Sequence, residues 1–307
     1  YPTGIELDLA WHKISQKAWE SCMCYPKLGI ALTYWGFDNK EVLGQGMTGL
    51  FYIEPVFNTK GRVNYSVRAG LGLSYQNSPY DPVSNPDNLS YSTYIGVPLQ
   101  LGGTVHCRIK SRWLLNGTLV YNHISNGGVS QPNKGINWPS IGIGMAYYLK
   151  EFEFKKRAVN NWRDLGPPQK RLDFTFFMAY EEPRDNLFLL SPGLEIKWSK
   201  QFARVIAYTL GGEVMYDNGT GYVLEQNGDE AIPVNAGIAV GLEFLLGKFL
   251  FSQQFGVYLN NPNPMHSDVY QRYGLVYRIN KNFNIGINLK AHGHVANFLD
   301  IRMGFSL

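Results

Sequence analysis

Long runs of the chain alternate strictly between apolar and polar residues. In residues 62–76 the odd positions from Val63 to Tyr75 are apolar or aromatic, and the even positions from Asn64 to Gln76 are polar or glycine. A period of two indicates a β-strand whose two faces meet different surroundings. A strand this long exceeds the usual five or six residues and can cross a bilayer at the usual tilt.

The same alternation recurs to the end of the chain, where Leu299, Ile301, Met303, Phe305 and Leu307 share one face. Polar loops such as 78–88, 217–230 and 260–268 separate some strands, and short turns such as 58–61 separate others. Long loops on one side and short turns on the other are typical of outer-membrane barrels. We expect strands near residues 5–11, 25–38, 46–57, 62–76, 94–109, 111–123, 137–149, 171–181, 188–201, 203–217, 232–246, 248–259, 268–278, 282–291 and 297–307.

This pattern predicts an all-β protein: a transmembrane antiparallel up-and-down β-barrel spanning residues 1–307. Since single-chain bacterial barrels have even strand numbers, we expect about fourteen strands, with twelve or sixteen as alternatives. Apolar residues make up 45% of the chain and charged residues only 17%. No run approaches the ~20 apolar residues of a transmembrane helix, so strands are the expected spanning elements.

The charged residues fall on the polar face of the strands, and we expect that face to line the barrel interior. A charge facing lipid at mid-membrane costs about 2–4 kcal/mol. Because these residues include both positive and negative charges, we expect a network of ion pairs that fills the interior. An open diffusion pore is an alternative for this polar interior. The alternative is a soluble β-sandwich or lipocalin-like barrel. Such a protein would not need an apolar outer face in every strand, so the pattern favours the membrane barrel. The residues on this polar face are Glu6, Asp8, Glu54, Arg68, Arg108, Glu195, Lys197, Glu213, Glu243 and Arg302.

Other features of the chain do not favour a metal, a cofactor or a nucleic acid. The basic segment 152–164 is expected to be a solvated loop, so we expect no nucleic-acid partner. Cys22 and Cys24 are too close for an easy mutual disulfide, and Cys107 lies alone in a strand, so the redox state of the three cysteines stays open. The pair His292 and His294 has no acidic or cysteine partner at ligand spacing. We therefore expect no metal site and no cofactor.

One motif points to chemistry. In "YNHIS" the odd positions continue the lipid-facing row of their strand, which places His123 and Ser125 on the outer wall. Asn137 begins the lipid-facing row of the next strand. Unpaired polar groups gain nothing from lipid contact, whereas a serine with a base in hydrogen-bond reach can act as a nucleophile. We interpret this trio as a candidate esterase site on the lipid-facing wall.

The segment "HISNGGVSQPNKGIN" resembles the lipid A 3-O-deacylase (PagL-like, acyloxyacyl hydrolase) family of outer-membrane β-barrels. The resemblance covers residues 1–150, and residues 151–307 would then be additional barrel strands. It implies His123 as general base and Ser125 as nucleophile. It also implies Asn126, Gly128 and Asn133 as oxyanion-binding or positioning groups, and places Asn137 where the family has a glutamate.

The resemblance implies hydrolysis of an acyl ester of lipid A in the bacterial outer membrane, with lipopolysaccharide as the lipid partner. An amide at Asn137 can orient a histidine but cannot stabilise an imidazolium by charge, and no Asp or Glu lies between Asp87 and Glu151. The alternative is therefore a catalytically weak or inactive barrel that serves as a structural subunit with partner proteins in a larger outer-membrane assembly.

Overall fold

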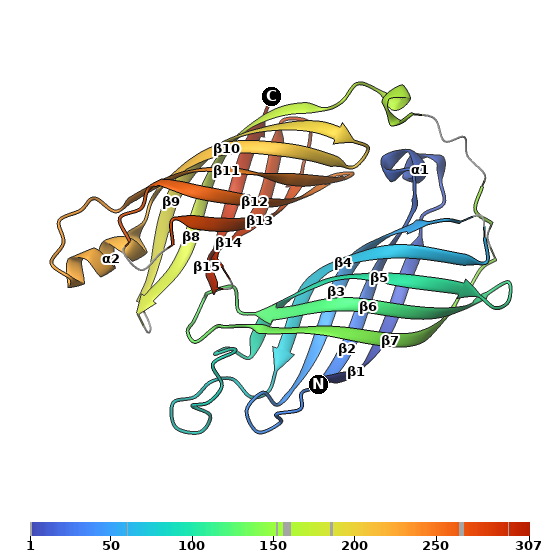
Figure 1. The fold of residues 1–307 in the computed structure, drawn as a ribbon, viewed down its shortest axis with the longest axis horizontal. Helices are drawn as coiled ribbons and strands as arrows, with labels where there is room; N and C mark the ends of the chain where they lie inside the picture. Colours follow the sequence, from blue (N-terminus) through green and yellow to red (C-terminus); the bar gives the residue numbers. More distant parts are fainter. Residues whose placement is uncertain are drawn as a thin grey trace. The chain divides into compact units, whose positions relative to one another are not determined.

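The computed structural model describes residues 2–59, 61–151, 153–155, 161–184, 187–263, 267–293 and 295–307, except for the side chains of Leu165 and Arg184. The chain divides into two compact units, residues 1–126 with 132–160 and residues 127–131 with 161–307. Figure 1 shows both units as strongly twisted antiparallel sheets. Among the described residues, no helix has the length and apolarity needed to cross a membrane.

The first unit is a seven-stranded sheet in which each strand pairs with the next along the chain. Among the described residues, the edge strands β1 and β7 each pair with a single strand. Near one end of these two strands, Nδ1 of His12 lies 3.1 Å from the hydroxyl of Tyr148. The strands are β1 Thr3–His12, β2 Tyr25–Gly36, β3 Gln45–Phe57, β4 Val63–Gln76, β5 Ile95–Arg108, β6 Trp113–Ser125 and β7 Ile136–Tyr147, and helix α1 Gln16–Cys22 follows β1.

The second unit is a closed barrel of eight strands, because β15 pairs with β8 and so joins the two ends of the meander. A short 3₁₀ helix at Trp162–Leu165 precedes it, and helix α2 Asn218–Gln226 lies between β10 and β11. The strands are β8 Lys170–Arg184, β9 Leu187–Ala203, β10 Ile206–Tyr216, β11 Val234–Leu246, β12 Phe249–Asn260, β13 Val269–Arg278, β14 Phe283–His292 and β15 Val295–Ser306.

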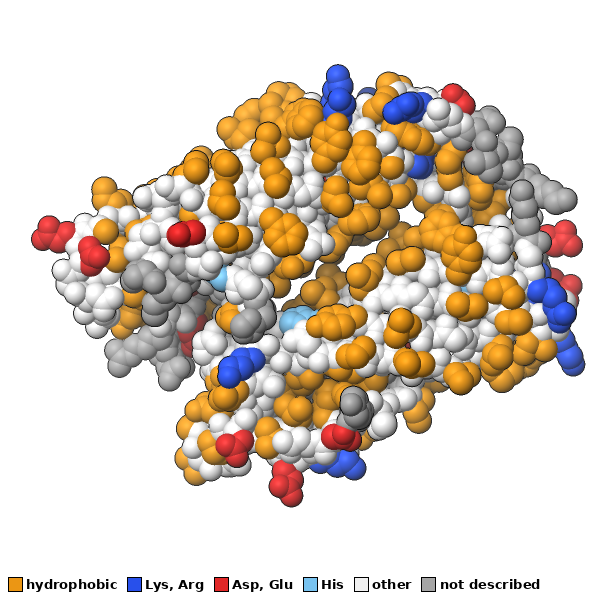
Figure 2. Space-filling view, viewed as in Figure 1, with side chains coloured by type: hydrophobic (Ala, Val, Ile, Leu, Met, Phe, Trp, Pro, Cys, Tyr) orange, Lys and Arg blue, Asp and Glu red, His pale blue; other side chains and the backbone are white. Residues whose placement is uncertain are grey.

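In both units the apolar face of the strands points outward. On β4, Val63 and Tyr65 are 46% and 53% exposed, whereas Asn64 and Ser66 between them are 4% and 3% exposed. Figure 2 shows hydrophobic side chains spread over the strands, with many of the charged side chains near their ends. This is the reverse of a soluble sheet and is the pattern expected of strands that face lipid.

The inner face carries a network of ion pairs, as the polar parity of the strands predicts. In the first unit the guanidinium of Arg68 contacts Glu6, Asp8 and Glu54. Buried ions of this kind are stabilised only when they are paired. The second unit fills its lumen in the same way, with pairs Arg171–Glu243, Lys197–Glu243, Arg171–Asp173, Arg302–Asp300, Arg302–Glu195 and Lys290–Glu213.

The all-β, antiparallel, up-and-down class is confirmed, but the strands do not form one continuous sheet. The structure has fifteen strands among the described residues, and β8–β15 close on themselves. Residues 170–307 are therefore hydrogen-bonded as a barrel of their own and do not extend the first sheet. The alternation of apolar and polar residues identifies a strand and its apolar face. It does not determine which two strands pair to close a barrel.

The sequence left the redox state of Cys22 and Cys24 open and their close spacing spoke against an easy disulfide, but the structure joins them by a disulfide with a Cα–Cα distance of 5.1 Å. That distance is within the normal range for disulfides. Met23 between them adopts a left-handed conformation with φ of 54° at the end of α1. This bend brings together two side chains that an extended chain would hold apart. Cys107 is a free thiol.

Candidate active site on the outer wall

Strands β6 and β7 bring the three predicted residues of the candidate site together. His123 lies directly opposite Asn137 in the antiparallel register of the two strands. Leu119 and Tyr121 precede His123 on the same face and are 61% and 53% exposed, so this face is the outer wall. His123 is half-buried, Asn137 is exposed and Ser125 is 4% exposed.

The imidazole of His123 bridges the other two side chains. Its Nδ1 lies 2.7 Å from Oδ1 of Asn137, and its Nε2 lies 3.0 Å from Oγ of Ser125. An amide oxygen only accepts hydrogen bonds, so Nδ1 carries the proton in this arrangement. Nε2 is then the unprotonated nitrogen that faces the serine hydroxyl, which is the geometry a general base requires.

A tyrosine that the sequence analysis did not assign completes this row. The hydroxyl of Tyr121 donates to Oδ1 of Asn137 at 3.2 Å, so that oxygen accepts hydrogen bonds from both Tyr121 and His123. A carbonyl oxygen has two lone pairs and can accept from both groups at once, while the amide nitrogen points elsewhere. Residues two apart on one strand share a face. The spacing between Tyr121 and His123 could therefore have predicted from the sequence that Tyr121 lies beside the candidate site.

The loop after β6 holds a second pair of predicted residues against each other. The backbone N–H of Asn126 donates to Oδ1 of Asn133 at 3.0 Å, and Nδ2 of Asn126 donates to Oγ of Ser92 at 3.1 Å. Asn133 is 4% exposed, and its Nδ2 has no hydrogen-bond partner among the described residues. A buried amide donor without an acceptor can bind an oxyanion.

Glycines give this loop its shape. Gly135 has φ of +71°, and a Cβ there would lie 2.9 Å from Cε1 of His123 and 3.2 Å from the carbonyl oxygen of Ile124. Glycine is therefore required both by its backbone conformation and by the closeness of the imidazole. Gly128 also has a positive φ, of 83°, and its part in an oxyanion site stays a sequence-based prediction.

Residues 77–94 form a long loop that supports the candidate site. Its carbonyl oxygens at Leu89 and Ser90 accept from the backbone N–H groups of Lys134 and Gly135 at 3.1 and 2.8 Å. Beneath the loop lies an apolar cluster that includes Ile124, the residue between His123 and Ser125 in sequence. The members of the cluster are Trp35, Phe37, Tyr91, Ile124, Ile136 and Trp138.

Two ionisable groups of that loop have shifted pKa values. Burial raises the pKa of Tyr91 to about 12, and its neutral hydroxyl donates to the carbonyl oxygen of Leu43 at 2.8 Å. The backbone N–H groups of Ser84 and Val83 donate to Asp81 and lower the pKa of its carboxyl. Asp81 therefore fixes the turn at residues 81–85 in its ionised form.

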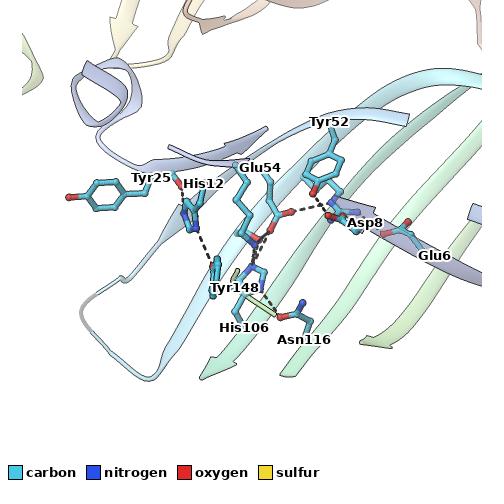
Figure 3. Close-up of polar contacts among 12 residues, drawn as sticks. Glu6, Asp8, His12, Tyr25, Tyr52, Glu54, His106, Asn116 and Tyr148 are labelled. Atoms are coloured by element: carbon cyan, nitrogen blue, oxygen red, sulfur yellow. Dashed lines mark hydrogen bonds and ion pairs between the residues drawn. The ribbon is translucent and has the colours of Figure 1, made fainter. Parts of the chain in front are cut away.

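A second serine–histidine–asparagine set lies on the inner face of the first unit. Ser66 Oγ is 2.8 Å from Nε2 of His106, and Nδ1 of His106 is 2.9 Å from Oδ1 of Asn116. Figure 3 shows His106 and Asn116 beside Glu54, within the ion-pair network of the inner face. Because the Ser66 hydroxyl donates to Glu54 at 2.7 Å, its proton is already held by a carboxylate. This set is part of the buried charge network and lacks an available nucleophile.

No group of three or more His, Cys, Asp or Glu side chains in the described part of the chain is arranged to hold a metal ion. His292 lies 3.2 Å from the Tyr258 hydroxyl through its Nε2. His294, the other member of the histidine pair in the sequence, lies outside the described residues.

Two family descriptions match the chain in succession. "Lipid A 3-O-deacylase (PagL)" matches residues 5–148, which are the strands of the first unit. "Acyloxyacyl hydrolase, C-terminal domain" matches residues 170–307, which are the strands of the second unit. Together the two matches cover nearly the whole chain.

No curated protein matches the chain. Among solved structures, two variants of the porin from Rh. blastica align with all of this chain and 91% of their own, at 11% and 12% identity and TM-scores of 0.21 and 0.22. A triple mutant of the Rhodopseudomonas blastica porin aligns over the same shares at 8% identity, with a TM-score of 0.21. Scores this low support no inference about fold or function.

Proposed function

Since this chain belongs to the lipid A 3-O-deacylase (PagL-like, acyloxyacyl hydrolase) family, we propose that it hydrolyses an acyl ester of lipid A by a serine mechanism. Family membership supports a lipid A deacylase-like function, with lipid A of lipopolysaccharide as substrate. The observation that carries the mechanism is the position of the His123 imidazole, between Ser125 Oγ and Asn137 Oδ1 on the outer wall.

The proposed reaction is acyl transfer in two steps. Ser125 Oγ attacks the ester carbonyl carbon while its proton moves to Nε2 of His123. His123 then gives this proton to the departing lipid A alkoxide, leaving the acyl group on Ser125. A water molecule, deprotonated by His123, attacks the acyl-enzyme, and His123 returns the proton to Ser125 Oγ as the fatty acid leaves.

The negative charge on the tetrahedral intermediate needs fixed donors. The unpartnered, buried Nδ2 of Asn133 supplies one, and its orientation is set by the hydrogen bond from Asn126 N–H to Oδ1. Removing one such donor in a serine protease lowers kcat by about 10²–10³.

Location in the outer membrane is part of this proposal. Apolar side chains face outward on the strands of both units, and a long loop stands at the Ser125 end of the first sheet. An outer-wall catalytic site then lies where lipid A ester bonds are found. Ser125 is only 4% exposed, so the residues that cover it must move aside before its Oγ reaches an ester carbon.

Asn137 favours a second candidate, a barrel of low or no activity that serves as a subunit of a larger outer-membrane assembly. A neutral amide orients His123 but does not stabilise an imidazolium by charge. In a serine protease the change from carboxylate to amide lowers kcat by about 10⁴, although there it also selects the wrong tautomer. Here the Nδ1 proton faces an amide oxygen, so only the loss of charge applies.

Mass spectrometry of lipid A from matched cells tests the proposal, with wild type, Ser125→Ala and no protein compared. Loss of one acyl chain with wild type alone is expected. Ser66→Ala is the matched control, because Ser66 also contacts a histidine but lies on the inner face. Identical spectra in all cells, with folding confirmed by heat-modifiable gel mobility, would favour the inactive subunit.

A further inference from the structure

A cluster of buried oxygen atoms lies inside the second barrel, at the end where α2 packs against β8 and β9. It is formed by Glu181 of β8, Asp217 just before α2 and Asn235 of β11, which are 8%, 0% and 2% exposed. Figure 1 shows α2 at this end of the barrel. Three separate elements therefore meet at one point in the lumen.

Asp217 holds the cluster together. Its Oδ1 accepts from the N–H of Thr220 at 2.6 Å and so caps α2, while its Oδ2 accepts from Nδ2 of Asn235 at 2.5 Å. The side chain of Glu181 forms hydrogen bonds with Ser191 and Asp217, and the one to Asp217 requires a proton shared between the two carboxyl groups. Carboxylates from β8 and from the start of α2 are thus in direct contact.

Two acceptors in this cluster are unsatisfied. Oε1 of Glu181 and Oδ1 of Asn235 are buried and have no hydrogen-bond partner among the described residues. The amide nitrogen of Asn235 already donates to Asp217. Turning the amide over would place its oxygen against the Asp217 carboxylate, so the oxygen must stay on the side without a partner. A buried acceptor is stable only when it meets a donor or a cation.

The charges around the cluster do not balance. Among the described side chains no cation forms an ion pair with Glu181 or Asp217, and the nearby Lys290 pairs with Glu213 at 3.0 Å. Among the described residues this end of the lumen holds five carboxyl groups and three cations, which leaves an excess of two negative charges once the proton shared by Glu181 and Asp217 is released. The carboxylates are Glu181, Glu195, Glu213, Asp217 and Asp300, and the cations are Arg272, Lys290 and Arg302.

We propose that Glu181, Asp217 and Asn235 bind one calcium ion. Carboxylate and amide oxygens are the ligands that calcium prefers, and a divalent cation matches both the charge excess and the two unsatisfied acceptors. Calcium tolerates an irregular set of oxygen ligands completed by water, whereas magnesium demands near-ideal octahedral geometry. The ion ties β8, the start of α2 and β11 together and holds this end of the barrel closed.

Equilibrium dialysis with radioactive calcium tests the site on the full chain, refolded in detergent and stripped with EDTA. One calcium ion per chain is expected to bind. Glu181→Gln and Asn235→Leu are each expected to weaken binding at least tenfold. Asp217→Asn, which keeps a capping side chain for α2, is expected to do the same. Glu225→Gln is the matched control, because Glu225 is an exposed carboxylate on α2.

Heat-modifiable gel mobility checks that each variant forms its barrel, and the same gels with and without calcium give a second readout. Calcium is expected to raise the temperature at which wild type unfolds, and not that of Glu181→Gln. Wild type that binds no calcium would overturn the site and leave Glu181 and Asp217 sharing a proton. Equal binding by wild type and Glu181→Gln, or tighter binding of magnesium, would overturn it as well.

Discussion

The hydroxyl of Tyr121 lies 3.2 Å from Oδ1 of Asn137, the atom that also receives the hydrogen bond from His123. The hydrogen bond from Tyr121 thus supports the orientation in which the Asn137 oxygen faces the imidazole. If the amide turned over, its NH₂ group would face Nδ1 and would move the proton of His123 to Nε2. The histidine would then be unable to accept the proton of Ser125.

Tyr121→Phe is expected to lower kcat about tenfold, the equivalent of one hydrogen bond of roughly 1–1.5 kcal/mol. The measurement is release of fatty acid from lipid A by purified protein. Asn137→Asp removes the need for an orienting tyrosine, because both oxygens of a carboxylate accept. In that background Tyr121→Phe should cost less than twofold. An equal loss in both backgrounds would contradict an orienting role for Tyr121.

Asn137→Asp alone is expected to raise kcat. Aspartate has the shape of asparagine and adds the negative charge that stabilises an imidazolium. The corresponding loss in a serine protease, about 10⁴, includes a tautomer change and sets the upper limit. Adding Ser125→Ala must abolish the gain. Unchanged activity would mean that stabilisation of the His123 charge does not limit the reaction.

Asn133→Ala removes the proposed oxyanion donor and is expected to lower kcat by about 10²–10³ with a small change in KM, because the interaction forms in the transition state. Asn116→Ala is the comparison, as Asn116 contacts the inner-face His106. A rise in KM with constant kcat would instead indicate that Asn133 binds the substrate in its ground state.

Gly135→Ala is expected to abolish activity without preventing barrel formation. Alanine is strained at φ of +71°, and its Cβ would displace the His123 imidazole 2.9 Å away. Gly117→Ala on β6 is the matched control, because a Cβ there meets nothing within 4 Å. Activity and heat-modifiable mobility are compared for the two variants. Full activity of Gly135→Ala would show that the loop tolerates a displaced backbone.

The turn held by Asp81 should weaken in acid. Its backbone hydrogen bonds lower the pKa of the carboxyl in the folded protein, so its contribution is complete above the unfolded pKa, about 3.9. The contribution is lost as the pH falls through the lower folded value. Amide hydrogen exchange of residues 81–85 should be faster in Asp81→Ala than in wild type at neutral pH, and the difference should shrink as the pH falls through the lowered folded pKa of Asp81. A constant difference would exclude the ionised form as its source.

Alternation along the chain determined the strands and their faces. It predicted the outward row that carries His123 and Asn137, and it placed Ser66 and His106 on the opposite face. Successive side chains of a strand point to opposite faces of the sheet. Whether a residue stands at an odd or an even position in its strand therefore determines which face its side chain occupies. The motif around Ser125 also indicated the family, since its residues are contiguous in sequence.

Only the tertiary structure decided which distant groups meet. The closure of β15 on β8, the contact of Asn133 with Asn126 and the gathering of Glu181, Asp217 and Asn235 all join segments that no sequence period relates. The Cys22–Cys24 disulfide depended on one left-handed residue, Met23. Strand pairing and loop conformation arise from contacts across the whole chain, whereas a local pattern records only the surroundings of each residue.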